Sequence, residues 1–257
     1  MMVHFKSSQS SDVKLMFLLW CMASLAMAPV IFMVFSPHDP LTLSSLVRTD
    51  RQLMQLLNGD AGAMVDRFWY AYSSFRVWTL VMGMVAVSLW TVCGGTWRRR
   101  LVFLVVVVLL LAFLDQLSSG VIKPLVGRLR PSHDPAICGL LHYVGDYRGG
   151  RYGFVSGHAT NIVGLVTWLC LVYKDKLSRS MFLLFAVMMC YSRIYLGVHY
   201  PGDILAGAIL GASISTVVYH FVAPHFEIDH TRRPVGLMVA IGATVIVLIG
   251  YGAWPMI

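Results

Sequence analysis

The sequence predicts an all-α membrane protein, a bundle of helices that crosses a bilayer several times. Apolar residues make up 58% of the 257 residues, charged residues only 12%, and the mean hydropathy is +0.72. An ordinary soluble chain is roughly a quarter charged. The charges here interrupt long apolar runs, which is typical of helices that contact lipid. This composition excludes a soluble globular protein and a disordered one.

The apolar runs predict seven spanning helices, the last of them at the C-terminal end. A helix needs about 20 apolar residues to cross the hydrocarbon. The expected spans are 15–35, 77–94, 101–120, 158–173, 180–197, 204–223 and 235–254. The first run is too long for a typical cleaved signal, so we expect it to be retained.

Three regions follow from this layout: an N-terminal span with outward-facing helices (1–76), a core that carries every motif described below (77–223), and a cytoplasmic linker with the C-terminal span (224–257). In the first region, apolar residues recur twice at helical spacing. This pattern predicts short helices lying in the membrane interface. The residues concerned are Leu43, Leu46, Val47, Met54 and Leu57, and then Met64, Val65, Phe68, Trp69 and Tyr72.

The net charge of +8 indicates membrane topology rather than a nucleic-acid partner. Cytoplasmic loops carry an excess of Lys and Arg, and one alternating topology places four basic clusters inside. No basic stripe with interleaved aromatic residues remains for DNA or RNA. The four clusters hold ten of the 20 basic residues: Lys6 and Lys14; Arg98, Arg99 and Arg100; Lys174, Lys176 and Arg179; Arg232 and Arg233.

The first outward-facing cluster follows the third span and contains Lys123, Arg128 and Arg130, with Pro131 after them. Phosphate suits such a group, because Arg offers bidentate donors and Lys a point charge. Basic side chains at a membrane edge also snorkel to lipid headgroups. This cluster alone leaves both interpretations open.

The second cluster is Ser156, Gly157 and His158, where the fourth span begins. A helix start presents free backbone N–H groups to an anion, and His158 could donate a proton to a leaving oxygen. The structural alternative is a histidine that caps or anchors a helix end.

The third cluster joins the fifth and sixth spans and contains Arg193, His199 and Asp203, with Pro201 at the expected helix start. His199 and Asp203 are four residues apart and can meet on one face. The carboxylate would fix the imidazole tautomer and leave the other ring nitrogen free to attack. A purely structural His–Asp pair is the alternative, and the cations on the same side of the membrane weigh against it.

The three clusters together supply the parts for phosphoryl transfer without a metal. Over roughly residues 100–215 they resemble the signature of the type 2 phosphatidic acid phosphatase superfamily. The resemblance implies a six-helix phosphatase with no cofactor, in which His199 forms a phosphohistidine, Asp203 orients it and His158 protonates the leaving group. One departure is Val155, where the family usually has proline. The implied phosphate-binding residues are Lys123, Arg130, Ser156, Gly157 and Arg193.

Weaker predictions concern the outer loop and the third span. Arg148 and Arg151 flank two glycines, and with Arg128 they are candidates for holding a second phosphate or a headgroup. Asp115 is expected to make a structural hydrogen bond. His133 and His142 are expected to be ordinary loop residues.

The leading functional prediction is a lipid phosphatase of a bacterial inner membrane, multi-pass, with its active site at the periplasmic face. Undecaprenyl diphosphate ranks first by family analogy, followed by phosphatidylglycerol phosphate and the 1-phosphate of lipid A. A lipid phosphotransferase and a non-catalytic lipid-phosphate binder or transporter are the alternatives. A pure binder would need only the cations, so His158, His199 and Asp203 favour an enzyme. The oligomeric state is left open.

Overall fold

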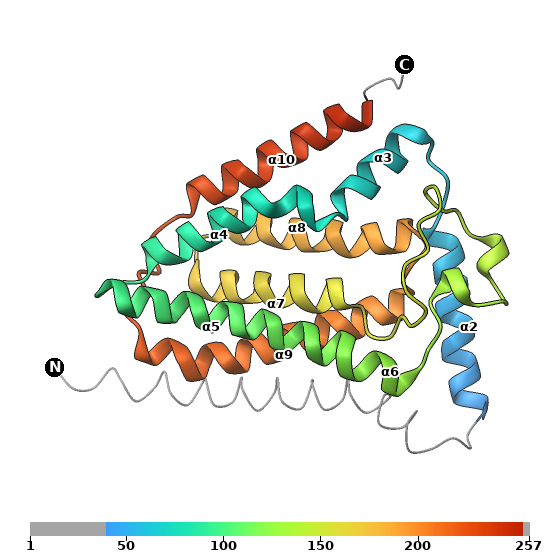
Figure 1. Ribbon diagram of the computed structural model, residues 1–257, viewed down its shortest axis with the longest axis horizontal. Helices are drawn as coiled ribbons and strands as arrows, with labels where there is room; N and C mark the ends of the chain where they lie inside the picture. The colour runs from blue at the N-terminus through green and yellow to red at the C-terminus, as the bar shows by residue number, and fades with distance from the viewer. Residues whose placement is uncertain (1–39, 254–257) are drawn as a thin grey trace.

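Long apolar helices dominate the computed structural model, which describes the backbone of residues 40–253 and the side chains from residue 45. Within these residues the elements are helical apart from two isolated bridges, as predicted. The long helices of the bundle run roughly along one axis, and α2 (Pro40–Leu57) lies across its end (Figure 1). Five are long and apolar enough to cross a membrane: Phe75–Val92, Trp97–Val126, Lys176–Tyr195, Pro201–His225 and Val235–Ala253. The expected first span, 15–35, lies outside the described residues.

The expected spans of the core correspond to helices whose bounds differ from the predictions by a few residues. The bundle consists of α4 (Thr79–Val92, preceded by the 3₁₀ turn Phe75–Trp78), α5 (Trp97–Asp115), α7 (Gly157–Val172), α8 (Lys176–Tyr195), α9 (Pro201–Val222, followed by the turn Ala223–His225) and α10 (Val235–Ala253). α5 continues through a π-helical segment (Gln116–Ile122) into α6 (Lys123–Val126). α7, with 16 residues, is the shortest of these bundle helices after α4, which has 14.

The two ends of the bundle differ in chemistry. At one end, on the left in Figure 1, lie the connections α4–α5, α7–α8 and α9–α10, which carry three of the basic clusters. At the other end lie α6, the start of α7, the end of α8 and the start of α9, which carry the three motifs. The separation of basic clusters from motifs therefore matches the sequence prediction.

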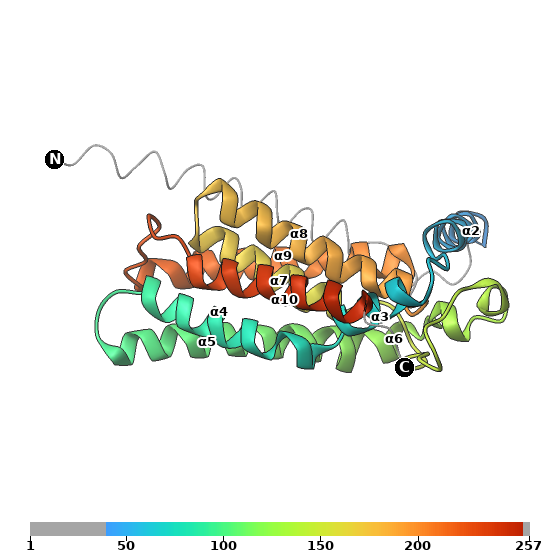
Figure 2. The same cartoon turned by 90° about the horizontal axis from the view of Figure 1, so that it is seen from above.

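Two further helices precede the bundle, where interfacial helices were predicted. α2 (Pro40–Leu57) lies across the motif end of the bundle (Figures 1 and 2), and α3 (Ala63–Tyr72) packs against α10. Leu56 of α2 is 78% exposed, whereas Met54 is fully buried. Arg67 of α3 donates to the Gly252 carbonyl at 2.6 Å, which ties α3 to the end of α10.

Glycines let α7 and α9 approach closely, and this contact aligns the motif ends of both helices. A Cβ atom at Gly211 would lie 2.1 Å from the Thr160 carbonyl oxygen, and one at Gly207 would lie 2.7 Å from that of Ser156. Small residues four apart are the usual means of close helix contact in membranes. The Ser156 N–H then donates to the Asp203 carbonyl at 3.0 Å. The second motif is thereby fixed against the third.

Gly211→Ala should destabilise the protein by about 1–3 kcal/mol, because the added methyl group pushes α7 away from α9. Thermal unfolding of the purified protein in detergent measures the change. The matched control is Gly242→Ala in α10, where a Cβ would meet no atom within 4 Å. Equal unfolding temperatures for the two variants would contradict the proposed contact.

Candidate active site

The three sequence motifs converge at one end of the bundle around His199. Arg130 lies against the ring, with its Nη1 2.8 Å from His199 Nε2. The same guanidinium donates to the backbone oxygens of Tyr152 and Val198, both at 3.1 Å. Antiparallel backbone bonds hold this segment in place, including Arg130 N–H to Arg151 O at 3.0 Å. His199 is 1% exposed and Arg130 is also buried.

The contacts of His199 assign its tautomer. A guanidinium only donates hydrogen bonds, so His199 Nε2 accepts from Arg130 and carries a lone pair. The proton is then on Nδ1, which faces Asp203 Oδ2 at 3.4 Å. Asp203 Oδ2 also accepts from the Tyr200 N–H at 3.1 Å, at the start of α9. This arrangement leaves the lone pair on Nε2, and the role of His199 as nucleophile stays a prediction.

Arg193 presents a donor that no group of the described residues accepts. Its Nη1 donates to the Ser73 hydroxyl at 3.0 Å and its Nη2 to the Tyr147 hydroxyl at 2.8 Å. Its Nε is buried without a partner among the described residues. A buried N–H of a cation is costly to leave unpaired. An anion in the site would satisfy it.

The start of α7 and the π-helical segment after α5 form the opposite wall. Lys123 Nζ donates to Ser119 Oγ at 3.1 Å. A Cβ atom at Gly157 would lie 2.8 Å from Ser119 Oγ and 3.5 Å from Lys123 Nζ. Gly157 therefore allows the backbone of α7 to approach the lysine. The Ser156 hydroxyl caps α7 by accepting from Ala159 N–H, so Ser156 positions the helix start.

His158 projects from the first turn of α7 and is half-buried. The charged and titratable groups that act on it are Arg193, His199, Lys123 and Arg130. The residue thus belongs to the same cluster as the predicted nucleophile. A second imidazole at this place can serve as a proton donor or acceptor.

The electrostatic surroundings keep His199 neutral. Burial lowers the pKa of His199 well below its ordinary value, and the charges of Arg130, Arg193 and Lys123 lower it further. A hydrogen bond to the Gly153 backbone acts in the opposite direction and does not outweigh them. A neutral imidazole has a free lone pair, which a nucleophile requires.

The structure gives Arg128 contacts that differ from the predicted role in binding a second phosphate. Its two terminal nitrogens pair with Asp203 Oδ1 at 2.9 Å and Asp50 Oδ2 at 2.7 Å. Two carboxylates already compensate its charge. Arg148 stacks on the Tyr143 ring at 3.9 Å from the centroid and donates to the Gly145 carbonyl. Arg151 is exposed, and its role in holding a headgroup stays a prediction.

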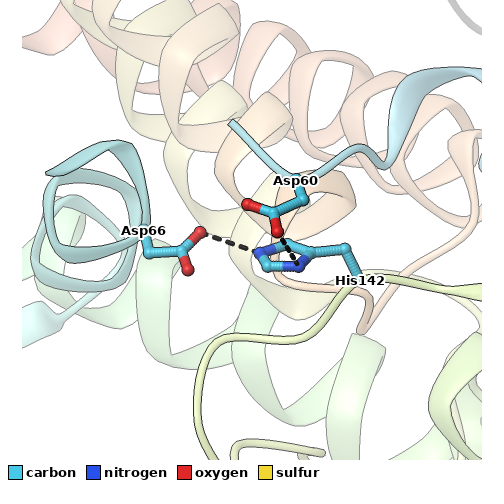
Figure 3. A group of neighbouring side chains, drawn as sticks. All are labelled: Asp60, Asp66 and His142. Atoms are coloured by element: carbon cyan, nitrogen blue, oxygen red, sulfur yellow. Dashed lines mark hydrogen bonds and ion pairs between the residues drawn. The ribbon is translucent and has the colours of Figure 1, made fainter. Parts of the chain in front are cut away.

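A separate cluster of Asp60, Asp66 and His142 ties the outer loop to α3 (Figure 3). His142 Nε2 lies 2.8 Å from Asp66 Oδ1, and its Nδ1 lies 4.0 Å from Asp60 Oδ2. The carboxylates face different ring nitrogens, whereas one metal ion binds a single imidazole nitrogen. The geometry therefore suits ion pairing. The hydrogen bond predicted for Asp115 is also present, from Asn161 at 3.0 Å.

Several residues of the site carry no motif in the sequence. Ser73 and Tyr147 hold Arg193, Ser119 holds Lys123, and Asp50 holds Arg128. Ser73 and Asp50 precede the first motif by at least 50 residues, so spacing gives no signal for them. Of these residues, only Ser119 could have been found from the sequence, because it lies one helical turn before Lys123.

Comparison with known proteins identifies the family. Residues 100–227 match the sequence model of the PAP2 superfamily. The chain is 34% identical over 175 residues to a lipid A 4'-phosphatase of Bacteroides thetaiotaomicron, a match that covers 68% of this chain and 76% of that protein. The chain belongs to the PAP2 superfamily and is a membrane phosphatase of the PAP2 type.

Two further relatives extend the comparison. An undecaprenyl-diphosphatase of Sulfolobus acidocaldarius is 42% identical over 65 residues, covering 25% of this chain and 31% of that protein. The crystal structure of a transmembrane PAP2-type phosphatidylglycerolphosphate phosphatase from Bacillus subtilis superimposes with a TM-score of 0.57. At 19% identity it covers 82% of this chain and 98% of that chain, which supports a shared fold.

Arg193→Lys should lower kcat/KM for a lipid phosphate by roughly 100-fold, because an ammonium cannot reproduce the guanidinium fork. Tyr147→Phe should lower it by about 3–10-fold, because Arg193 loses one neutral acceptor. Steady-state release of phosphate measures both effects. Tyr70→Phe is the control, since that ring packs against Tyr147 without a bond to Arg193. A Tyr147→Phe enzyme as active as Tyr70→Phe would rule out the assigned role.

Proposed function

We propose that this protein hydrolyses a lipid phosphomonoester through a phosphohistidine on His199, at the periplasmic face of a bacterial inner membrane. The observation that carries the proposal is the buried pair of His199 and Arg193. The lone pair of His199 Nε2 lies beside Arg130, and Arg193 Nε lies buried without a partner among the described residues. A phosphoryl oxyanion would accept from Arg193 Nε, and this contact would bring its phosphorus atom toward the lone pair of His199 Nε2.

In the first step, His199 Nε2 attacks the phosphorus atom, the N–P bond forms and the ester P–O bond breaks. His158 gives its proton to the departing lipid oxygen. Nδ1–H continues to face Asp203, which stabilises the positive charge that develops on the ring. Lys123, Arg130 and Arg193 stabilise the charge on the phosphoryl oxygens.

In the second step, water attacks the phosphorus atom of the phosphohistidine. His158, now neutral, accepts a proton from that water, and the N–P bond breaks. Inorganic phosphate leaves, and both histidines return to their starting protonation states. The same donors serve both steps, because the phosphoryl group stays among the same cations. Transfer to a lipid or sugar hydroxyl would use the same geometry, so the acceptor distinguishes a hydrolase from a phosphotransferase.

We rank the 4'-phosphate of lipid A as the first substrate candidate. The lipid A 4'-phosphatase relative aligns over 76% of its own length. The contacts of Arg128 also favour a monoester, because its charge is compensated by Asp50 and Asp203 rather than left for a second phosphate. Undecaprenyl diphosphate becomes the second candidate, supported by the shorter match to the Sulfolobus enzyme.

The purified protein should release phosphate from lipid A and leave the 1-phosphate in place, as mass spectrometry of the product would show. Undecaprenyl diphosphate and phosphatidylglycerol phosphate complete the panel and should react more slowly. His199→Ala should lose at least about 1,000-fold of the activity, because the nucleophile is removed.

The activity should persist in EDTA, because the proposed steps use side chains alone. Loss of turnover in EDTA, or full turnover by His199→Ala, would overturn the histidine mechanism. A faster reaction with undecaprenyl diphosphate would reverse the substrate ranking and leave the mechanism intact.

The pH dependence of kcat/KM should show an acid limb below about 6.5, the ordinary pKa of histidine. The attack needs neutral His199, whose pKa is lowered by burial and by three neighbouring cations. Activity is therefore retained as the pH falls through 6.5 and lost only below it. The alkaline limb should appear in kcat, because His158 must be protonated in the complex, where the bound phosphate offsets the charges of Lys123, Arg130 and Arg193. An acid limb above 7 would contradict this assignment.

A further inference from the structure

We propose that Asp50 and Arg128 are positioning residues that set the effective charge of Asp203 behind the nucleophile. Asp50 comes from α2, outside residues 100–227 that match the family. The proposal rests on the proposed role of His199, and it assigns a function in catalysis to a helix that carries no motif.

Arg128 stands between two carboxylates at the base of the site. Its Nη1 donates to Asp203 Oδ1 at 2.9 Å and its Nη2 to Asp50 Oδ2 at 2.7 Å. Its guanidinium also lies over the Tyr200 ring, 4.2 Å from the centroid. The side chain of Asp203 is fully buried, and those of Asp50 and Arg128 are mostly buried. Charged hydrogen bonds in such a place are strong and sensitive to the charge of each member.

The position of Asp50 is fixed from two further directions. Its Oδ1 accepts from the Gly202 N–H at 2.8 Å, in the first turn of α9. The next residue, Arg51, pairs with Asp134 at 2.8 Å, and Asp134 accepts from the Tyr200 hydroxyl at 2.6 Å. These contacts join Asp50 to Gly202 and, through Asp134, join Arg51 to Tyr200, the residue that follows His199. Asp50 is thus held against the start of α9 and has little freedom to move away from Arg128.

The charge balance gives Asp50 its catalytic consequence. Asp203 uses Oδ2 for His199 and Oδ1 for Arg128. If Arg128 faced Asp203 alone, its positive charge would cancel the negative charge that stabilises the histidine during phosphoryl transfer. Asp50 shares the charge of Arg128, so the three residues together keep one net negative charge beside the imidazole. The other charged or titratable groups around His199 are Lys123, Arg130, Arg193 and His158.

The test uses Asp50→Asn, which keeps the shape and an oxygen for Gly202 but removes the charge. We expect kcat to fall about 10-fold, equivalent to one pKa unit of lost stabilisation, with KM changed less than about twofold because Asp50 does not contact substrate. The acid limb of kcat/KM should move to lower pH by about half a unit, because a nearby negative charge that favours protonated His199 has been removed.

Arg51→Gln is the matched control, because it loosens the same helix without changing the charge next to Arg128. It should lower the unfolding temperature and leave the acid limb where it is. Asp60→Asn, in the exposed connection between α2 and α3, controls for loss of a surface carboxylate. An acid limb that moves equally in Arg51→Gln and Asp50→Asn would show a merely structural role and overturn the proposal.

A double variant tests the route of the effect. If Asp50 acts through Arg128, Asp50→Asn should cause no further loss in an Arg128→Gln background, whereas independent effects would add. Independent additive losses would also overturn the proposal. Histidine NMR of ¹⁵N-labelled protein gives the pKa of His199 without any substrate, and Asp50→Asn should lower it. This measurement decides the inference even if the enzyme proves inactive on the lipids tested above, which would count against the proposed function instead.

Discussion

The structure depends on holding cations close together without neutralising them. Arg130 donates to backbone carbonyls and to His199, Arg193 to two hydroxyl groups, and Lys123 to one hydroxyl group. All of these acceptors are uncharged, so they fix the side chains while leaving the positive charges available to an anion. Arg128 and Arg51 are bound by carboxylates instead. The type of acceptor therefore separates cations whose charge is available to a ligand from cations whose charge is paired within the protein.

This separation relies on helix packing as much as on the polar groups. The glycines of α9 let it contact the backbone of α7, and Ser156 then donates to the Asp203 carbonyl. The π-helical segment before α6 turns Lys123 and Ser119 toward the same point. Irregular helical turns of this kind recur at functional sites. A shift of one helix along another would move a cation away from His199. The placement of the charges therefore depends on the close packing of the helices.

The sequence predicted the helices and the motifs because both rest on local patterns. Apolar runs indicate spans, Pro201 marks a helix start, and the spacing of His199 and Asp203 places them on one face. The partners of these residues were not predictable in the same way. Ser73 and Tyr147 meet Arg193 across 120 and 46 residues, and nothing in the neighbourhood of Ser73 indicates an anion site. Arg128 was predicted to bind a phosphate or a headgroup because the sequence does not show which acceptor a basic side chain contacts in the folded protein.

The helix α2 illustrates why such assignments need the folded chain. Its apolar pattern predicted an interfacial helix, and exposed Leu46 and Leu56 agree with an apolar outer surface. Its inner surface is partly polar, since Asp50 pairs with Arg128 and Arg51 pairs with Asp134. A charged residue on an amphipathic helix is ordinarily assigned to the solvated face. Here the opposite holds, because the buried Arg128 needs a second carboxylate if Asp203 is to keep its charge for the nucleophile. The chemistry of the buried site requires this second carboxylate, and Asp50 of α2, which lies outside the bundle, supplies it.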